Sequence, residues 1–74
     1  MYIILVEFVR SPDFTERLYV SRRNEAGQIT FADEPAGARK WRTRTRAQRY
    51  YEAEFAQFGI SGCVCEAPKK EATT

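Results

Sequence analysis

The chain contains no histidine among its 74 residues, and it has only two cysteines, three prolines and four glycines. Without histidine, Ser-His-Asp and Cys-His catalysis, histidine metal sites and the commonest general acid–base residue are excluded. Two cysteines cannot complete a tetrahedral zinc shell unless two chains each contribute a pair. The scattered glycines form no phosphate-binding fingerprint. The composition therefore predicts a protein that is not an enzyme and that uses no metal or cofactor.

Long hydrophobic runs are also lacking. The apolar run at residues 2–9 is interrupted by Glu7, and it is far shorter than the roughly 20 residues that span a bilayer. It has no basic leader, so we expect no signal peptide. Cys63 and Cys65 would share one strand face near the far limit of disulfide reach, which favours reduced thiols. These features predict a cytoplasmic protein without membrane contact.

Apolar residues make up 43% of the chain and charged residues 30%, which is ordinary for a globular protein. We expect a single domain over residues 1–67 and a flexible C-terminal tail over residues 68–74. Alternating and β-branched patterns predict strands at residues 2–9, 17–23, 28–32 and 60–67, with a further extended segment at 39–43.

Thr45 resembles a helix N-cap, with Gln48 completing a capping box, and Gly59 resembles a helix stop. A helix is therefore expected over about residues 46–58. The predicted fold is α+β: an antiparallel sheet of four to five strands with one amphipathic helix packed on one face, in the order β-β-β-(β)-α-β.

Residue parity along the strands separates two sheet faces. The almost purely apolar set is expected to meet the helix: Ile4, Val6, Phe8, Leu18, Val20, Ile29 and Phe31. The mixed set is expected on the open face: Ile3, Leu5, Glu7, Val9, Arg17, Tyr19, Ser21, Arg23, Gln28 and Thr30. The expected helix stripe is Ala47, Tyr51, Phe55 and Phe58. Trp41 is expected to point inward, which places Lys40 and Arg42 on the open side.

The net charge of +2 conceals a strong asymmetry, because residues 35–50 carry six basic groups and no acid. Those six groups could contact phosphates or a protein partner, or they could be solubilising charge on an edge strand and an exposed helix face. Arginine in the first helical turn opposes the helix dipole, which favours a contact role. The predicted partner-binding residues are Arg39, Lys40, Arg42, Arg44, Arg46 and Arg49, with Arg17, Tyr19 and Arg23 as a second candidate surface.

The stretch Ala38-Arg39-Lys40-Trp41, a following threonine and the alanine-containing helix resemble a pattern in small proteins encoded by phages and prophages, over about residues 17–58. Among such proteins the chain resembles the anti-CRISPR proteins, although many of those are acidic DNA mimics and this chain has a basic centre. The resemblance implies an inhibitor that binds a subunit of a bacterial CRISPR effector complex in the host cytoplasm, with guide RNA or DNA phosphates as possible contacts.

Two other functions remain open at the level of sequence. One is a small nucleic-acid-binding module. The other is a structural phage protein that self-associates through Ile3, Leu5, Val9 and Tyr19. The protein would accordingly be a monomer or a homodimer.

Overall fold

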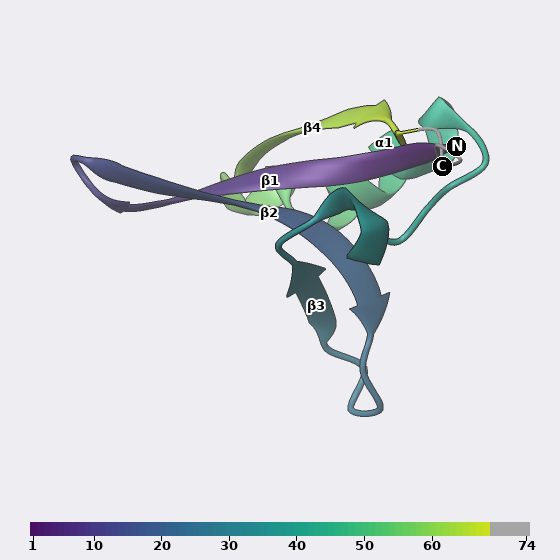
Figure 1. The fold of residues 1–74 in the computed structure, drawn as a ribbon, viewed down its shortest axis with the longest axis horizontal. Coiled ribbons are helices and arrows are strands. Elements are labelled where there is room, and N and C mark those ends of the chain that lie inside the picture. Colours follow the sequence, from purple (N-terminus) through teal and green to yellow (C-terminus); the bar gives the residue numbers. More distant parts are fainter. Residues whose placement is uncertain (69–74) are drawn as a thin grey trace, which may run out of the picture.

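The computed structural model describes residues 1–68, which form a four-stranded antiparallel sheet with one helix packed against it (Figure 1). The sheet order is β3-β2-β1-β4. In chain order the elements are β1 (Tyr2–Ser11), β2 (Phe14–Arg23), β3 (Ile29–Ala32), the 3₁₀ turn η1 (Pro35–Gly37), α1 (Arg44–Glu54), the 3₁₀ turn η2 (Ala56–Phe58) and β4 (Ser61–Glu66). The predicted α+β class and β-β-β-α-β order are confirmed. Of the predicted tail, residues 69–74 lie outside the described residues.

β1 and β2 form a long hairpin whose tip projects from the rest of the molecule (Figure 1). Pro12 and Asp13 alone make the turn, and Ser11 pairs with Phe14 across it. Because the turn is so tight, β2 begins at Phe14, three residues before its predicted start. No helix within residues 1–68 has the length and apolar character needed to cross a membrane.

The pairing of β1 with β2 ends at Leu5 and Tyr19, and the segment before the helix enters at this point. The Arg39 amide donates to the Val20 carbonyl at 2.9 Å, and Tyr2 and Trp41 exchange two backbone hydrogen bonds of 2.8 Å. The expected extended segment at 39–43 is thus a single bridge and not a fifth strand. Trp41 points inward as predicted, with 7% of its surface exposed.

The hydrophobic core lies between the sheet and α1. Its buried members are Ile4, Val6, Val20, Trp41, Ala47, Phe55 and Val64. Phe8 and Ile29 pack at the margin of this cluster, and the Phe31 ring lies 6.2 Å from the Phe55 ring. The apolar parity set, apart from Leu18, therefore lies in or beside the core that the helix covers, as expected. Full burial of one such side chain contributes about 1.5–3 kcal/mol.

The helix begins two residues earlier than predicted, because Thr43 and not Thr45 is its N-cap. The Thr43 hydroxyl accepts a hydrogen bond from the Arg46 amide at 3.2 Å. The expected capping box is wrong, since the Gln48 side chain donates to Glu52 instead. The bridge at Trp41 determines where the chain leaves the sheet, and Thr43 is the first suitable cap after it.

The helix also ends earlier than predicted, at Glu54. Phe55 has φ −131° and ψ −50°, which leaves the helical region and turns its ring into the core. The η2 turn follows, and Gly59 ends this turn in the left-handed region at φ 78°. Gly59 therefore stops the 3₁₀ turn and not the helix that it was predicted to end. This turn leaves Phe58 69% exposed, and its placement on the buried stripe is therefore wrong.

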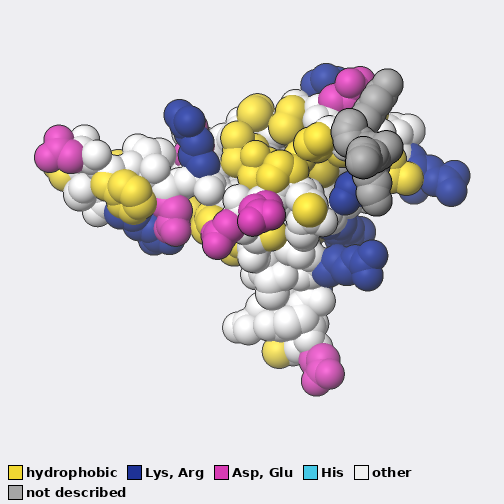
Figure 2. Space-filling view, viewed as in Figure 1, with side chains coloured by type: hydrophobic (Ala, Val, Ile, Leu, Met, Phe, Trp, Pro, Cys, Tyr) yellow, Lys and Arg dark blue, Asp and Glu magenta, His cyan; other side chains and the backbone are white. Residues whose placement is uncertain are grey.

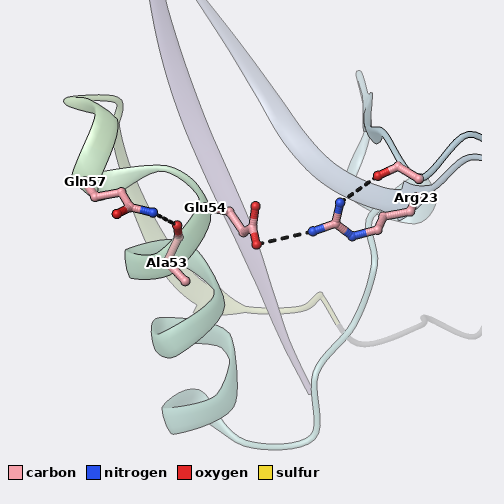
Figure 3. A network of polar contacts seen from close by, with 5 residues as sticks. Arg23, Ala53, Glu54 and Gln57 are labelled. Atoms are coloured by element: carbon pink, nitrogen blue, oxygen red, sulfur yellow. Dashed lines mark hydrogen bonds and ion pairs between the residues drawn. The ribbon is translucent and has the colours of Figure 1, made fainter.

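An irregularity in β2 moves Arg23 to the opposite face from the one predicted. Val20 pairs with Phe31 but Arg23 pairs with Ile29, so β2 contains one extra residue between the two pairs. Such a bulge reverses the side-chain alternation. The Arg23 guanidinium lies 3.2 Å from Glu54 of α1 and donates to the Gly27 carbonyl at 2.7 Å (Figure 3). The expectation that Arg23 belongs to the open face is wrong.

Candidate functional site

The six predicted cations lie on the segment that leads into α1 and on the first two turns of the helix. Arg39 is half-buried and the other five are exposed: Lys40, Arg42, Arg44, Arg46 and Arg49. Lys and Arg side chains gather at the end of the molecule where the N-terminus lies (Figure 2).

A seventh cation, Arg22, joins this group through the fold. Arg22, Arg39 and Lys40 line one open hollow of about 370 Å³, together with Met1 and Ala38. Strand alternation in the sequence did not identify Arg22. The bulge near the end of β2 changes which face its last residues occupy, and the sequence pattern does not reveal a bulge. We call these seven residues the basic surface: Arg22, Arg39, Lys40, Arg42, Arg44, Arg46 and Arg49.

The positive charge of the basic surface is not neutralised by carboxylates within residues 1–68. The ion pairs in that range join Arg10 to Glu16 at 2.9 Å, Arg17 to Glu7 at 2.7 Å and Arg23 to Glu54 at 3.2 Å. None of them involves a residue of the basic surface. All three arginines outside this surface are therefore paired, whereas none of the seven residues within it has a carboxylate partner in residues 1–68.

Two arginines of the basic surface are held in place by aromatic rings. The Arg39 guanidinium carbon lies 4.9 Å from the Trp41 ring centroid and 5.2 Å from that of Tyr50. Arg44 lies over the Tyr2 ring at 5.2 Å and donates to the Val64 carbonyl at 3.4 Å. Contacts of this kind are worth about 0.5–1 kcal/mol at exposed sites. They restrict the conformations of both side chains without cancelling their charge.

The second candidate surface is divided by the structure. Arg17 lies opposite Glu7 in the β1–β2 ladder and pairs with it. Tyr19 is half-buried, with Leu5 and Ala32 as its cross-strand partners. Arg23 lies on the helix face and contacts Glu54. Arg17 and Tyr19 therefore stay on the open face, two residues apart in β2, whereas Arg23 lies on the other face and is separated from them.

The two cysteines lie on the open face, where Cys63 pairs with Leu5 and Cys65 with Ile3. Both thiols are free. Burial raises the pKa of the Cys65 thiol above its ordinary value, the neighbouring Cys63 raises it further, and Arg44 partly offsets these effects. A raised pKa keeps Cys65 protonated and poorly nucleophilic at neutral pH. Residues 1–68 contain no group of three or more side chains that could together hold a metal ion.

Comparison of the chain with models of protein families, with curated proteins and with solved structures gave no match. The geometry and charge of the residues themselves therefore carry the functional proposal.

Proposed function

We propose that this protein is a non-enzymatic binding protein that holds a negatively charged partner against the basic surface. One observation carries the proposal: six cations lie on the segment before α1 and on its first two turns, Arg22 joins two of them around the hollow, and no carboxylate within residues 1–68 forms an ion pair with any of the seven. The lack of histidine in the chain supports binding over catalysis.

The position of the arginines supports a contact role over simple solubility. Arg44, Arg46 and Arg49 occupy the first two turns of α1, and the first turn contains no acidic residue. Cations at a helix N-terminus are unfavourable by about 0.3–1 kcal/mol each. Solubility could be supplied at less cost elsewhere on the surface. An anionic partner would remove the repulsion among these groups and would also interact favourably with the helix dipole.

The specific partner that we propose is a bacterial CRISPR effector complex, which this protein would inhibit in the host cytoplasm. The resemblance to small phage-encoded proteins supports this choice, and so does the chemistry, because such complexes hold an RNA–DNA duplex in the company of protein subunits. A basic contact surface could reach a protein subunit and nearby phosphates together.

The proposal is tested by affinity capture from CRISPR-active bacterial lysate, with and without nuclease, and by an assay of CRISPR interference. We expect effector subunits to be retained after nuclease treatment. Reversing the charge of Arg42, Arg46 and Arg49 to glutamate should abolish both capture and inhibition. Capture and inhibition unchanged by the triple reversal would contradict the role of the basic surface.

The open sheet face supports a second candidate function, in which copies of the chain self-associate in a phage structure. Leu5, Tyr19 and Cys65 are only partly buried there, and Cys63 is exposed. Hydrophobic side chains gather on the face of the molecule shown in Figure 2. An apolar patch of this kind is typical of a contact between proteins.

A further inference from the structure

The hollow within the basic surface concentrates three cations around one space. Arg22 comes from the end of β2, whereas Arg39 and Lys40 come from the segment that enters between β1 and β2. Among residues 1–68, no acidic side chain lines the hollow. Its volume of about 370 Å³ falls within the range of roughly 300–1,000 Å³ that is usual for small-molecule sites. The space is therefore large enough for a phosphate group and the sugar attached to it.

Of the three cations around the hollow, Arg39 is the one whose backbone and side chain are both held in place by other residues. Its amide donates to the Val20 carbonyl at 2.9 Å, which anchors the backbone to β2. Its guanidinium lies against the rings of Trp41 and Tyr50. Within residues 1–68 this guanidinium donates no hydrogen bond to a protein acceptor, so its N–H groups are available to a ligand. A planar guanidinium that is already oriented loses little entropy when it binds phosphate oxygens.

We propose that this hollow binds a phosphate group of a nucleic-acid backbone, with Arg39 as the central ligand and Arg22 and Lys40 at its sides. The inference rests on the proposed function of the basic surface and names its partner class. The two non-bridging oxygens of a phosphodiester accept hydrogen bonds from several cations at once. Arg42, Arg44, Arg46 and Arg49 continue the positive charge along the chain into α1, and they contact the phosphates on either side.

The same geometry predicts binding without base preference. Trp41 is buried beneath Arg39, and Tyr50 packs against both Trp41 and Phe55. Neither ring is free to stack on a base. Contacts to phosphate alone position a nucleic acid without reading its sequence.

The test is fluorescence anisotropy with a labelled single-stranded RNA of mixed sequence, about 16 nucleotides long, which matches the upper end of known single-strand site sizes. Binding is measured between about 50 and 200 mM salt, because each phosphate contact contributes about 0.7 to the slope of log K against log salt. The double variant Arg22→Gln/Lys40→Gln removes two cations from the hollow. The matched control, Arg10→Gln/Arg17→Gln, removes the same charge from the projecting hairpin.

We expect the hollow variant to bind about tenfold more weakly than the wild type, since two exposed charge contacts are worth about 0.7 kcal/mol each. Its salt slope should fall by about 1.4, which is two phosphate contacts. The control variant should lower the affinity and the salt slope by less than the hollow variant does. In the wild-type protein, the Arg39 Nε–H resonance should shift when the RNA is added.

Two results would overturn the inference while leaving the proposed function intact. In the first, the RNA binds but the hollow variant and the control weaken it equally. In the second, the wild type does not bind RNA at low salt, yet effector subunits are still captured after nuclease treatment; the partner is then an acidic protein surface. Absence of both RNA binding and capture would overturn the proposed function as well.

Discussion

At the scale of single residues, Gly62 is the glycine whose surroundings leave least room for a side chain. It lies in β4 opposite Val6, on the face that meets α1. A Cβ atom at this position would lie 2.5 Å from the Leu5 carbonyl oxygen and 3.0 Å from the Tyr51 ring. Tyr51 crosses β4 here and donates from its hydroxyl to the Ile60 carbonyl at 2.6 Å. Gly62 therefore permits the contact that joins the last strand to the helix.

We expect Gly62→Ala to lower the free energy of unfolding by about 3 kcal/mol, the upper part of the range for overpacking, because a backbone carbonyl cannot move aside as a side chain can. In a domain of this size the loss corresponds to a fall in Tm of roughly 15 °C. Thermal and urea unfolding followed by circular dichroism would measure both quantities.

Gly27→Ala is the matched control for this substitution. Gly27 has φ 82° and nothing within 4 Å of the added Cβ, so only the left-handed backbone is penalised, by about 1–2 kcal/mol. Gly62 itself has no left-handed backbone, so a loss for Gly62→Ala no larger than that for Gly27→Ala would contradict the steric account.

At the scale of elements, the start of α1 depends on which of two threonines caps it. Thr43 and Thr45 are both followed three residues later by a helical residue, and local sequence does not separate them. The hydrogen bonds between Tyr2 and Trp41 hold the chain to the sheet until residue 41. Thr43 then has the extended backbone that a cap requires, with φ −126° and ψ 151°.

This assignment predicts unequal effects for two similar substitutions. Thr43→Ala should lower the free energy of unfolding by about 1 kcal/mol, since the Arg46 amide loses its acceptor. Thr45→Ala should change it by less than about 0.5 kcal/mol, because Thr45 is an exposed residue inside the helix. Urea unfolding of both variants measures the difference, and a larger loss for Thr45→Ala would restore the capping box expected from the sequence.

At the scale of the whole molecule, the candidate surfaces differ in character. The basic surface extends from the hollow at Arg22 to the first two turns of α1, and its residues form no ion pair with a carboxylate of residues 1–68. The open face is apolar but is interrupted by the Glu7–Arg17 pair, and Ile3 is already buried within the chain. A stable interface removes about 800 Å² from each partner, and the protein exposes 5432 Å² in all. A dimer would therefore have to cover roughly a seventh of the whole surface, including the charged pair in the middle of the apolar residues.

We accordingly expect the isolated protein to sediment as a monomer whose mass does not depend on concentration. The control is Leu5→Lys, which places a charge at the centre of the open face and should leave the sedimentation unchanged. A wild-type mass that rises with concentration, and that returns to the monomer value in Leu5→Lys, would instead favour self-association through the open face.

The sequence alone determined the α+β class, the order of the elements and the apolar face that meets the helix. These features follow from local chemistry: side chains alternate along Tyr2–Ser11 and Phe14–Arg23, and Trp41 is apolar enough to predict its burial. The sequence also located six of the seven residues of the basic surface, because they are nearly contiguous in the chain.

Only the tertiary structure decided the rest. Residues 39–41 enter between β1 and β2, and this entry selects Thr43 as the helix cap. The bulge after Val20 moves the Arg23 side chain to the face that meets the helix, and the neighbouring Arg22 lines the hollow. Neither the choice of cap nor the position of the bulge can be predicted from nearby residues, because each depends on hydrogen bonds between segments that are distant in the chain. For the same reason, the grouping of Arg22 with Arg39 and Lys40 emerges only when the sheet is assembled.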